Sequence, residues 1–193
     1  MNGCCYDTLI GPLERWRLKN TRRELLGALE GQILDLGAGT GANFAFFQNP
    51  SQVVAAEPDP ELRRQADRRR PEGLTLLDSR AEDLPFDNES FDHVITTLVL
   101  CTVDDLEISL QQIHRVLKPE GRLHFLEHLR GDGFIGTLHD VCTPAWSKIA
   151  GGCHLNRRTL QTLRESGFSL EAHHTAFKFL GTPFEIGSAR KKP

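Results

Sequence analysis

The 193-residue sequence has no long apolar run, no strong excess of one charge and no regular spacing of its cysteines. No segment approaches the ~18 consecutive apolar residues that a transmembrane helix needs, and the first residues lack the apolar core of a signal peptide. A formal net charge of −3 argues against a basic protein that wraps nucleic acid. These absences predict a cytoplasmic protein with no transmembrane segment and no nucleic-acid partner.

The five cysteines are odd in number and follow no repeated spacing, so the sequence does not indicate a disulfide framework. Free thiols fit a reducing compartment. We interpret Cys101 and Cys153 as small buried hydrophobic residues. His173 and His174 would point to opposite faces of a strand, which disfavours their binding one ion. No metal site is predicted.

The sequence also lacks an internal repeat, a low-complexity tract and a linker. Its 39% hydrophobic and 25% charged residues are ordinary values for a globular protein. We therefore expect one domain over residues 1–193, long enough to bury roughly 70% of its unfolded surface. It divides into a helical lead-in (1–30), a cofactor-binding half (31–128) and an acceptor-side half (129–193).

The lead-in has leucines at near-helical intervals with arginines and lysines between them. This pattern predicts one or two amphipathic helices. We favour a lid that closes over substrate, and the alternative is peripheral membrane contact through residues 1–30. The sequence does not indicate an oligomeric state.

From residue 32 onward, apolar runs alternate with helical patterns, which predicts a mostly parallel sheet covered by helices on both faces. The predicted strands are 33–36, 53–56, 74–77, 93–100, 122–127, 168–176 and 183–190. The predicted helices are about 43–49, 60–70 and 105–117, a stretch at 135–150 broken by Pro144, and 157–166 capped by Asn156.

Residues 33–43 run an apolar strand into a glycine loop and then toward a helix. Glycine tolerates positive φ and lets the backbone pass close to a bulky ligand. Asp35 lies two residues before the first glycine and Glu57 ends the next apolar run, so both acids can accept hydrogen bonds from that ligand. In an open α/β sheet, ligands bind at the carboxyl ends of the strands where strand order reverses. The loop therefore predicts a nucleotide-like cofactor site.

Two cofactor classes compete for this loop. Gly37, Gly39 and Ala42 satisfy the G-x-G-x-x-G/A pattern of dinucleotide enzymes, which leaves an NAD-dependent oxidoreductase as an alternative. However, a pyrophosphate beside Asp35 would meet a negative charge. S-adenosyl-L-methionine has no phosphate, and its ammonium group suits Asp35, while Asn43 can bond its carboxylate. Electrostatics therefore favours the methyl donor.

Three further segments follow in order, Arg80–Phe86, Ser90–Ile95 and Leu117–Gly121. Together with the glycine loop they resemble class I S-adenosylmethionine-dependent methyltransferases of the methyltransferase type 11 group. The resemblance implies a Rossmann-like three-layer α/β sandwich with a seven-stranded, mostly parallel sheet whose last strand is antiparallel. It also implies S-adenosyl-L-homocysteine as the product.

The resemblance further implies which residues hold the cofactor. Arg80 stands where this group commonly has an acid that reaches the adenine amino group, and arginine cannot accept a hydrogen bond. We therefore expect Glu82 or a backbone carbonyl to hold that amino group, or weaker binding. The implied contacts are Asp35, Gly37 and Gly39 at the methionine moiety, Glu57 at the ribose, Pro58 and Asp59 beside the adenine, Ala81 and Glu82 at its edge, and Gly41, Asn43, Thr97 and Leu98 elsewhere in the site.

A narrower resemblance extends to about residue 190 and includes the acceptor side. It is to the small thiol S-methyltransferases, which act on hydrogen sulfide and alkyl thiols and in animals are anchored at lipid droplets or the endoplasmic reticulum. The hydrophobic anchor of the animal members has no counterpart here. The segments that carry the resemblance are Gly41–Phe44, Thr97–Cys101, Phe125–His128, Asp140, Pro144–Trp146 and Gly152–Arg157.

This resemblance implies a small-molecule acceptor, most simply a thiol. A thiol of pKa ~8.5 is already a few per cent thiolate near pH 7, so the enzyme needs mainly in-line positioning and an apolar pocket. We predict His128 and Asp140 as catalytic bases and Leu100, His139 and Trp146 as acceptor-binding residues. The alternatives are a phospholipid headgroup amine, a quinone precursor, and a partner subunit that binds S-adenosylmethionine without turnover.

Overall fold

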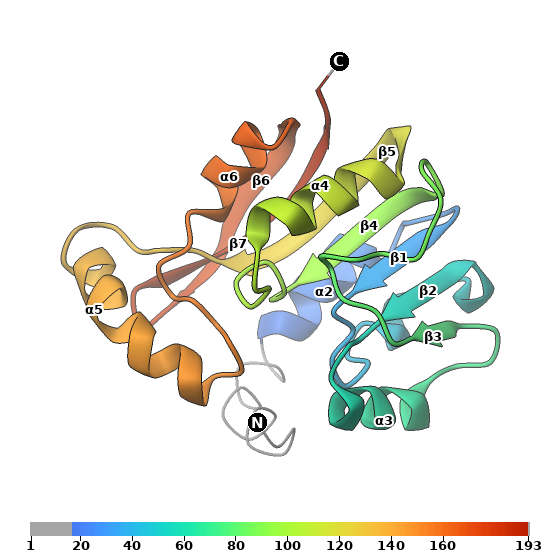
Figure 1. Ribbon diagram of the computed structural model, residues 1–193, viewed down its shortest axis with the longest axis horizontal. Helices are drawn as coiled ribbons and strands as arrows, with labels where there is room; N and C mark the ends of the chain where they lie inside the picture. The colour runs from blue at the N-terminus through green and yellow to red at the C-terminus, as the bar shows by residue number, and fades with distance from the viewer. Residues whose placement is uncertain (1–16, 193) are drawn as a thin grey trace.

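The computed structural model describes residues 17–192 and shows a central sheet with helices on both faces (Figure 1). The seven strands lie in the order β3-β2-β1-β4-β5-β7-β6. Their bounds are β1 (Ile33–Leu36), β2 (Val53–Ala56), β3 (Thr75–Leu77), β4 (Phe91–Thr97), β5 (Leu117–His128), β6 (Phe168–Phe179) and β7 (Thr182–Lys191).

Strand direction confirms the predicted fold class. β1 pairs in parallel with β2 and with β4, β2 with β3, and β4 with β5. Only β7, the last strand, runs antiparallel to its neighbours β5 and β6. The chain moves outward from β1 to β3 and then returns to β4, so strand order reverses between β1 and β4. Ligands of open α/β sheets bind at this reversal, beyond the carboxyl ends of the strands.

The helices of the described chain separate into two layers and one outlying helix. α2 and α3 contribute to the core on one face of the sheet, and α4 and α6 to the core on the other. α5 lies to one side of the sheet (Figure 1). The bounds are α2 (Lys19–Leu26), α3 (Pro60–Arg69), α4 (Leu106–Val116), α5 (Gly133–Ile149) and α6 (Thr159–Glu165), with single 3-10 turns η2 (Phe44–Phe46) and η3 (Pro50–Gln52).

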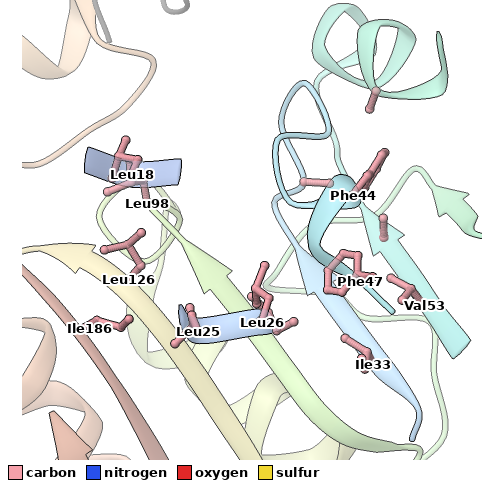
Figure 2. Close-up of a cluster of buried hydrophobic side chains, with 14 of the residues drawn as sticks. Leu18, Leu25, Leu26, Ile33, Phe44, Phe47, Val53, Leu98, Leu126 and Ile186 are labelled. Carbon is pink, nitrogen blue, oxygen red and sulfur yellow. The ribbon is translucent and has the colours of Figure 1, made fainter. Parts of the chain in front are cut away.

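The described part of the lead-in is a core element. Figure 2 shows Leu18, Leu25 and Leu26 among the buried side chains that surround Leu126 and Ile186 of the sheet. Leu18 and Leu26 are fully buried, and burying a leucine stabilises a fold by about 1.5–3 kcal/mol. α2 is therefore part of the core, and opening it would expose these leucines, so its packing disfavours a lid there; the lid role of the lead-in stays a prediction. Residues 1–16 lie outside the described part of the chain.

The opposite core forms around α4. Asp105 caps this helix, because its side chain accepts a hydrogen bond from the Ile108 N–H at 2.9 Å. Leu110, Ile113 and Val116 recur at helical spacing and are fully buried against the sheet. α4 therefore fixes the position of β5, which begins directly at its end.

Several predicted boundaries are wrong. The predicted helix at 43–49 is a single 3-10 turn, and β4 ends at Thr97 because Leu98 adopts φ +60°. α5 continues through Pro144 as one helix. α6 is preceded by Arg158 rather than capped by Asn156, which hydrogen-bonds Asp140 instead. Within residues 17–192, no helix has the length and apolar character to cross a membrane.

Candidate active site

The three glycines of the loop that follows β1 have different surroundings. Two lie directly against side chains, and one borders open space. Gly37, Gly39 and Gly41 all have positive φ, at +65°, +57° and +81°. A Cβ on Gly37 would lie 2.5 Å from a methyl of Val99, and one on Gly41 would lie 2.7 Å from the Phe44 ring. A Cβ on Gly39 would meet nothing closer than a carbonyl oxygen at 4.0 Å. Gly39 therefore borders the space in which a ligand can lie against the backbone.

Glu57 ends β2 next to this open glycine. Its Oε2 accepts from the Gly39 N–H at 2.7 Å, and its Oε1 accepts from the Asp59 N–H at 2.9 Å. Burial raises the pKa of the carboxyl group, and these two backbone bonds work in the opposite direction. Each carboxylate oxygen can accept a second hydrogen bond. Glu57 is thus oriented by the loop and still able to accept from a pair of hydroxyl groups.

Asp35 is fully buried beneath the same loop. Its Oδ1 accepts from the Asn43 side-chain amide at 2.6 Å, whereas Oδ2 has no hydrogen-bond partner among residues 17–192. Burial raises its pKa to about 7, although Asn43 and the Arg22 charge both oppose the change. A buried acceptor without a partner suits a cationic ligand group better than an anionic one.

Sequence reasoning missed Arg22, which anchors this network from α2. Its side chain is 6% exposed and donates to Asn43 Oδ1 at 2.6 Å and to Thr97 Oγ1 at 2.8 Å. One guanidinium therefore connects α2, the glycine loop and the end of β4. The sequence did indicate a buried position for this arginine. Arg22 lies four residues after Leu18 and four before Leu26, on the apolar face of the helix.

The residues predicted beside the adenine have mixed roles. Pro58 is exposed and free to pack against a ring. Asp59 caps α3, since its Oδ1 accepts from the Glu61 and Leu62 N–H groups at 2.8 and 3.0 Å. Ala81 is buried in the core shared with α4. Of these residues, Pro58 is the one that presents a surface to a ligand.

Glu82 and Arg80 interact with each other and with the residues that directly precede α4. Glu82 Oε1 accepts from the Asp104 and Asp105 N–H groups at 2.9 and 3.3 Å, and its Oε2 lies 3.5 Å from Arg80. The Arg80 guanidinium also pairs with the Asp104 carboxylate, which raises the pKa of Arg80. This geometry favours a backbone carbonyl, rather than Glu82, as the acceptor for an adenine amino group.

A second buried acid, Glu127, shapes the loop that follows β4. Its Oε1 accepts from the Val99 and Leu100 N–H groups at 2.9 and 3.0 Å, and its Oε2 from the Cys101 N–H at 3.3 Å. Burial raises the pKa of Glu127 against these three bonds. The loop begins at Leu98, whose φ of +60° turns the chain away from the sheet. Glu127 therefore positions residues 98–101 at the carboxyl end of β4.

Cys101, His128 and Cys153 come together at the carboxyl ends of β4 and β5, and we call them the sulfur–imidazole cluster. Their ligand atoms all lie within 4.8 Å of one another. His128 Nε2 is 2.9 Å from Cys153 Sγ, while His128 Nδ1 is buried without a partner in the described chain. The Cys101 thiol donates to Cys153, which lowers the pKa of Cys153 and raises that of Cys101. Sequence reasoning gave His128 a role in the site but interpreted both cysteines as buried hydrophobic residues.

The structure does not support Asp140 as a base. Its side chain is exposed and binds Arg130 in a bidentate ion pair, with Arg130 Nε and Nη2 at 3.0 and 2.7 Å from the two carboxylate oxygens. This pairing lowers the pKa of Asp140. A carboxylate held in that way is a poor proton acceptor, so the geometry disfavours Asp140 as a base, and its catalytic role stays a prediction.

The three predicted acceptor-binding residues differ in position. Leu100 is fully buried in the core around α4 and does not face the cluster. His139 is also structural, because its Nδ1 accepts from the Gly131 N–H at 3.1 Å and its Nε2 pairs with Thr182 Oγ1 at 3.0 Å. Trp146 lies near the cluster, since its indole contributes to lowering the pKa of Cys153. Its buried N–H has no hydrogen-bond partner of good geometry in the described chain.

Comparison with known proteins identifies the family. A methyltransferase domain family matches residues 34–125. The thiol S-methyltransferase TMT1B of Rattus norvegicus is 33% identical over 195 residues, which cover 91% of this chain and 80% of that protein. The chain belongs to the S-adenosylmethionine-dependent methyltransferase family that includes this enzyme. S-Adenosylmethionine is therefore the methyl donor of the methyltransferase described here, and S-adenosylhomocysteine is its product.

Two other similarities are less extensive in sequence. The demethylmenaquinone methyltransferase of Clavibacter sepedonicus is 36% identical over 121 residues, but this methyltransferase spans only about half of that protein's length, 49%. The solved structure of an S-adenosylmethionine-dependent methyltransferase from Thermotoga maritima matches with a TM-score of 0.71 over 97% of this chain and 98% of that one, at 23% identity. The structural match at that identity shows a shared fold.

The residues present fit this cofactor. Gly39 faces open space beside the Glu57 carboxylate, and Asp35 Oδ2 is an unsatisfied buried acceptor. S-Adenosylmethionine has two ribose hydroxyls, which match the oriented carboxylate of Glu57. It also has one ammonium group, which matches the unsatisfied carboxylate oxygen of Asp35. A pyrophosphate at the same loop would meet two buried acids, so the geometry does not favour a dinucleotide.

Proposed function

We propose that this methyltransferase transfers the methyl group of S-adenosylmethionine to the sulfur of a small thiol or of hydrogen sulfide. The similarity to the rat thiol S-methyltransferase supports this, because it runs through the acceptor-side half as well as the cofactor-binding half. The identity of the acceptor and the binding role of each residue are parts of this proposal.

The observation that carries the choice of acceptor is the state of the nearby acids. An amine is an ammonium at pH 7 and must lose a proton before it can attack, which calls for a free carboxylate or a similar base. Glu127 is buried and accepts from three backbone N–H groups, and Asp140 is paired with Arg130. A thiol has a much smaller deprotonation requirement. With both acids occupied, the imidazole of His128 is the base that remains, and so weak a base suits a thiol better than the ammonium of a phospholipid headgroup.

On the donor side, Glu57 accepts from the ribose hydroxyls and Asp35 accepts from the ammonium group in our proposal. Gly39 lets the cofactor lie against the backbone, and Pro58 packs on the adenine. When bound, S-adenosylmethionine supplies an electrophilic methyl group on a sulfonium sulfur. The end of β4, at Thr97 and Leu98, lies across the strand-order reversal from the glycine loop and faces the position between donor and acceptor.

On the acceptor side, His128 is the predicted base that remains at the carboxyl ends of the strands. Its ring is 7% exposed, and Nδ1 has no protein partner in the described chain. In the metal-free protein it can accept the proton of a bound thiol. Since a thiol is already a few per cent ionised, this raises the rate by only about tenfold.

The test measures S-adenosylhomocysteine formation by the purified chain with sodium hydrosulfide, 2-mercaptoethanol, phosphatidylethanolamine vesicles and a demethylated quinone as separate acceptors. We expect turnover with the two sulfur compounds and none with the amine lipid. Glu57→Gln is the control for cofactor-dependent turnover, and an enzyme-free mixture gives the background. Turnover with the lipid or the quinone but not with either sulfur compound would overturn the proposal.

A further inference from the structure

The sulfur–imidazole cluster contains more ligand groups than a proton transfer requires. Its three members come from the loop after β4, the end of β5 and the segment between α5 and α6, so the fold gathers them from positions 27 and 25 residues apart. Two thiols and an imidazole whose ligand atoms lie within 4.8 Å of one another are the donor set that thiophilic transition metals prefer.

We propose that the sulfur–imidazole cluster is a zinc site with three protein ligands and an open fourth position, at which the acceptor sulfur binds. The role of the fourth position rests on the proposed thiol methylation, whereas the metal site itself does not. Two cysteines and one histidine are a ligand set known for catalytic zinc, and catalytic zinc keeps one position for water or substrate.

The dimensions of the cluster suit this ion. Zinc–sulfur distances of about 2.3 Å and zinc–nitrogen distances of about 2.0 Å place the ligand atoms of a tetrahedral site about 3.5–3.8 Å apart. The three ligand atoms lie within 4.8 Å of one another, and His128 Nε2 is 2.9 Å from Cys153 Sγ. Side-chain movements of about 1 Å therefore convert the cluster into a coordination site.

The backbone already holds the two cysteines together. The Cys101 N–H donates to Glu127, and the Cys101 carbonyl accepts from the His154 N–H at 2.8 Å, next to Cys153 in the chain. Arg157 donates to the Leu100 carbonyl at 2.6 Å. These bonds fasten the α5–α6 segment to the loop after β4. A preorganised ligand set loses less entropy when it binds a metal than a flexible one.

One buried polar atom of the cluster, His128 Nδ1, has no partner in the described chain. The Trp146 indole lies against Cys153 and contributes to lowering the pKa of its thiol, although no hydrogen bond of good geometry joins the two side chains. Buried donors without partners call for a ligand or water. His128 Nε2 faces Cys153 and would be the zinc ligand, so Nδ1 lies on the side of the ring that points away from the metal. Histidine ligands of zinc donate that second N–H to a partner outside the coordination sphere, which a water molecule can supply here.

The chemistry balances without any redox step. The acceptor thiol binds zinc as a thiolate, and its proton leaves to solvent. A sulfur lone pair then forms a bond to the methyl carbon, the bond from that carbon to the sulfonium sulfur breaks, and its electron pair remains on the sulfur of S-adenosylhomocysteine. The neutral thioether is a weaker zinc ligand than the thiolate and leaves. In the zinc-bound state the metal replaces His128 as the group that favours the thiolate.

The experiment measures metal binding directly. The full chain is reduced with a phosphine, stripped with a chelator and titrated with zinc against a chromophoric competitor. We expect one zinc per chain, and at least a 100-fold loss of affinity in Cys101→Ser and in Cys153→Ser. The matched control is Cys142→Ser, because Cys142 is exposed on α5 and should leave zinc binding unchanged. Binding of S-adenosylhomocysteine by each variant reports that it is folded.

Cobalt substitution supplies the spectroscopic signature. A tetrahedral cobalt site with two thiolates gives intense visible bands and a sulfur-to-cobalt charge-transfer band, and sodium hydrosulfide should shift these bands if it occupies the fourth position. No zinc binding by the reduced wild type, or zinc binding by both cysteine variants as tight as that of the wild type, would overturn the site. Thiol methylation by a chain that binds no zinc would leave the proposed function standing, whereas zinc binding without thiol turnover would refute that function and keep the site.

Discussion

The buried carboxyl group of Asp35 sets the acid–base behaviour of the cofactor site, and Asp35→Asn tests it. Burial raises the pKa of this group from 3.8 to about 7, and its Oδ2 has no partner in the described chain. Asparagine has nearly the same shape and can still accept a hydrogen bond from Asn43, but it carries no charge. The substitution therefore removes the ionisation and changes little else.

The magnitude follows from linkage. A pKa about 3 above its unfolded value corresponds to about 4 kcal/mol, at about 1.4 kcal/mol for each pH unit. Because the folded-state pKa is the higher one, the wild type is stabilised by this proton at low pH and loses that stabilisation as the pH rises toward 7. The asparagine of the variant has no ionisable group, so it contributes no such pH dependence. As the pH rises from 5 to 8, we expect the free energy of unfolding of the variant to increase by about 2–3 kcal/mol relative to that of the wild type.

Urea unfolding of both ligand-free proteins across this pH range measures the difference. Asp87→Asn is the matched control, since Asp87 is exposed and the same chemical change there should produce no pH-dependent gap. In thermal unfolding, the gain at pH 8 should appear as a higher Tm, by about 2–4 °C for each kcal/mol in a chain of this length. A gap that stays constant with pH would refute the assignment of the raised pKa.

The same variant should bind the cofactor less well, although it is more stable. Loss of a charge-assisted contact to the ammonium group costs about 1.5–3 kcal/mol, so the affinity for S-adenosylhomocysteine should fall about 10- to 100-fold by calorimetry at pH 8. In the wild type this affinity should rise as the pH increases through about 7, because Asp35 becomes ionised. Unchanged affinity in the variant would mean that Asp35 does not contact the cofactor.

Other substitutions test the remaining parts of the site. Glu57→Gln should weaken S-adenosylhomocysteine binding about 10- to 100-fold in calorimetry, since one charge-assisted acceptor is lost, and should lower the unfolding free energy by about 1–3 kcal/mol, because the glutamine NH2 cannot accept from the Gly39 or Asp59 N–H. Arg22→Met should lower the unfolding free energy by about 3–5 kcal/mol in urea titration, because it leaves buried polar partners unsatisfied, and a loss below 1 kcal/mol would contradict the anchoring role. Asp140→Asn should keep thiol turnover within about twofold of the wild type. His128→Gln should lower thiol turnover and retain cofactor affinity. A large loss of turnover in Asp140→Asn with none in His128→Gln would contradict the placement of the acceptor site.

The cofactor half was largely predictable because its signals are local. A glycine loop between an apolar run and a helix needs only a few adjacent residues, and Glu57 follows at the end of the next run. The strand pattern gave the sheet for the same reason. The loop's support from Arg22 was missed, because its bond to Thr97 spans 75 residues of sequence and periodicity does not report such partners.

The acceptor half was less predictable because its groups meet only through tertiary structure. Asp140 and His128 look equally suitable as isolated residues, but one pairs with Arg130 on the surface and the other lies buried beside Cys153. Sequence reasoning gave Glu127 no role of its own, although its carboxylate accepts from three N–H groups of another loop. Whether an acid is free or occupied depends on its contacts, which sequence spacing does not encode.

The place of β7 between β5 and β6 has a consequence for synthesis. β6 has no hydrogen-bonded neighbour in the sheet except β7, and β7 is made after it. While the ribosome adds the ten residues of β7, at about 5–20 residues per second, β6 has an unpaired edge for on the order of a second. The parallel strands from β1 to β5 can pair with one another first, although the outer edge of β5 stays unpaired until β7 joins it. The nascent chain therefore passes through a stage in which the cofactor half is folded and the last two strands still need protection from aggregation.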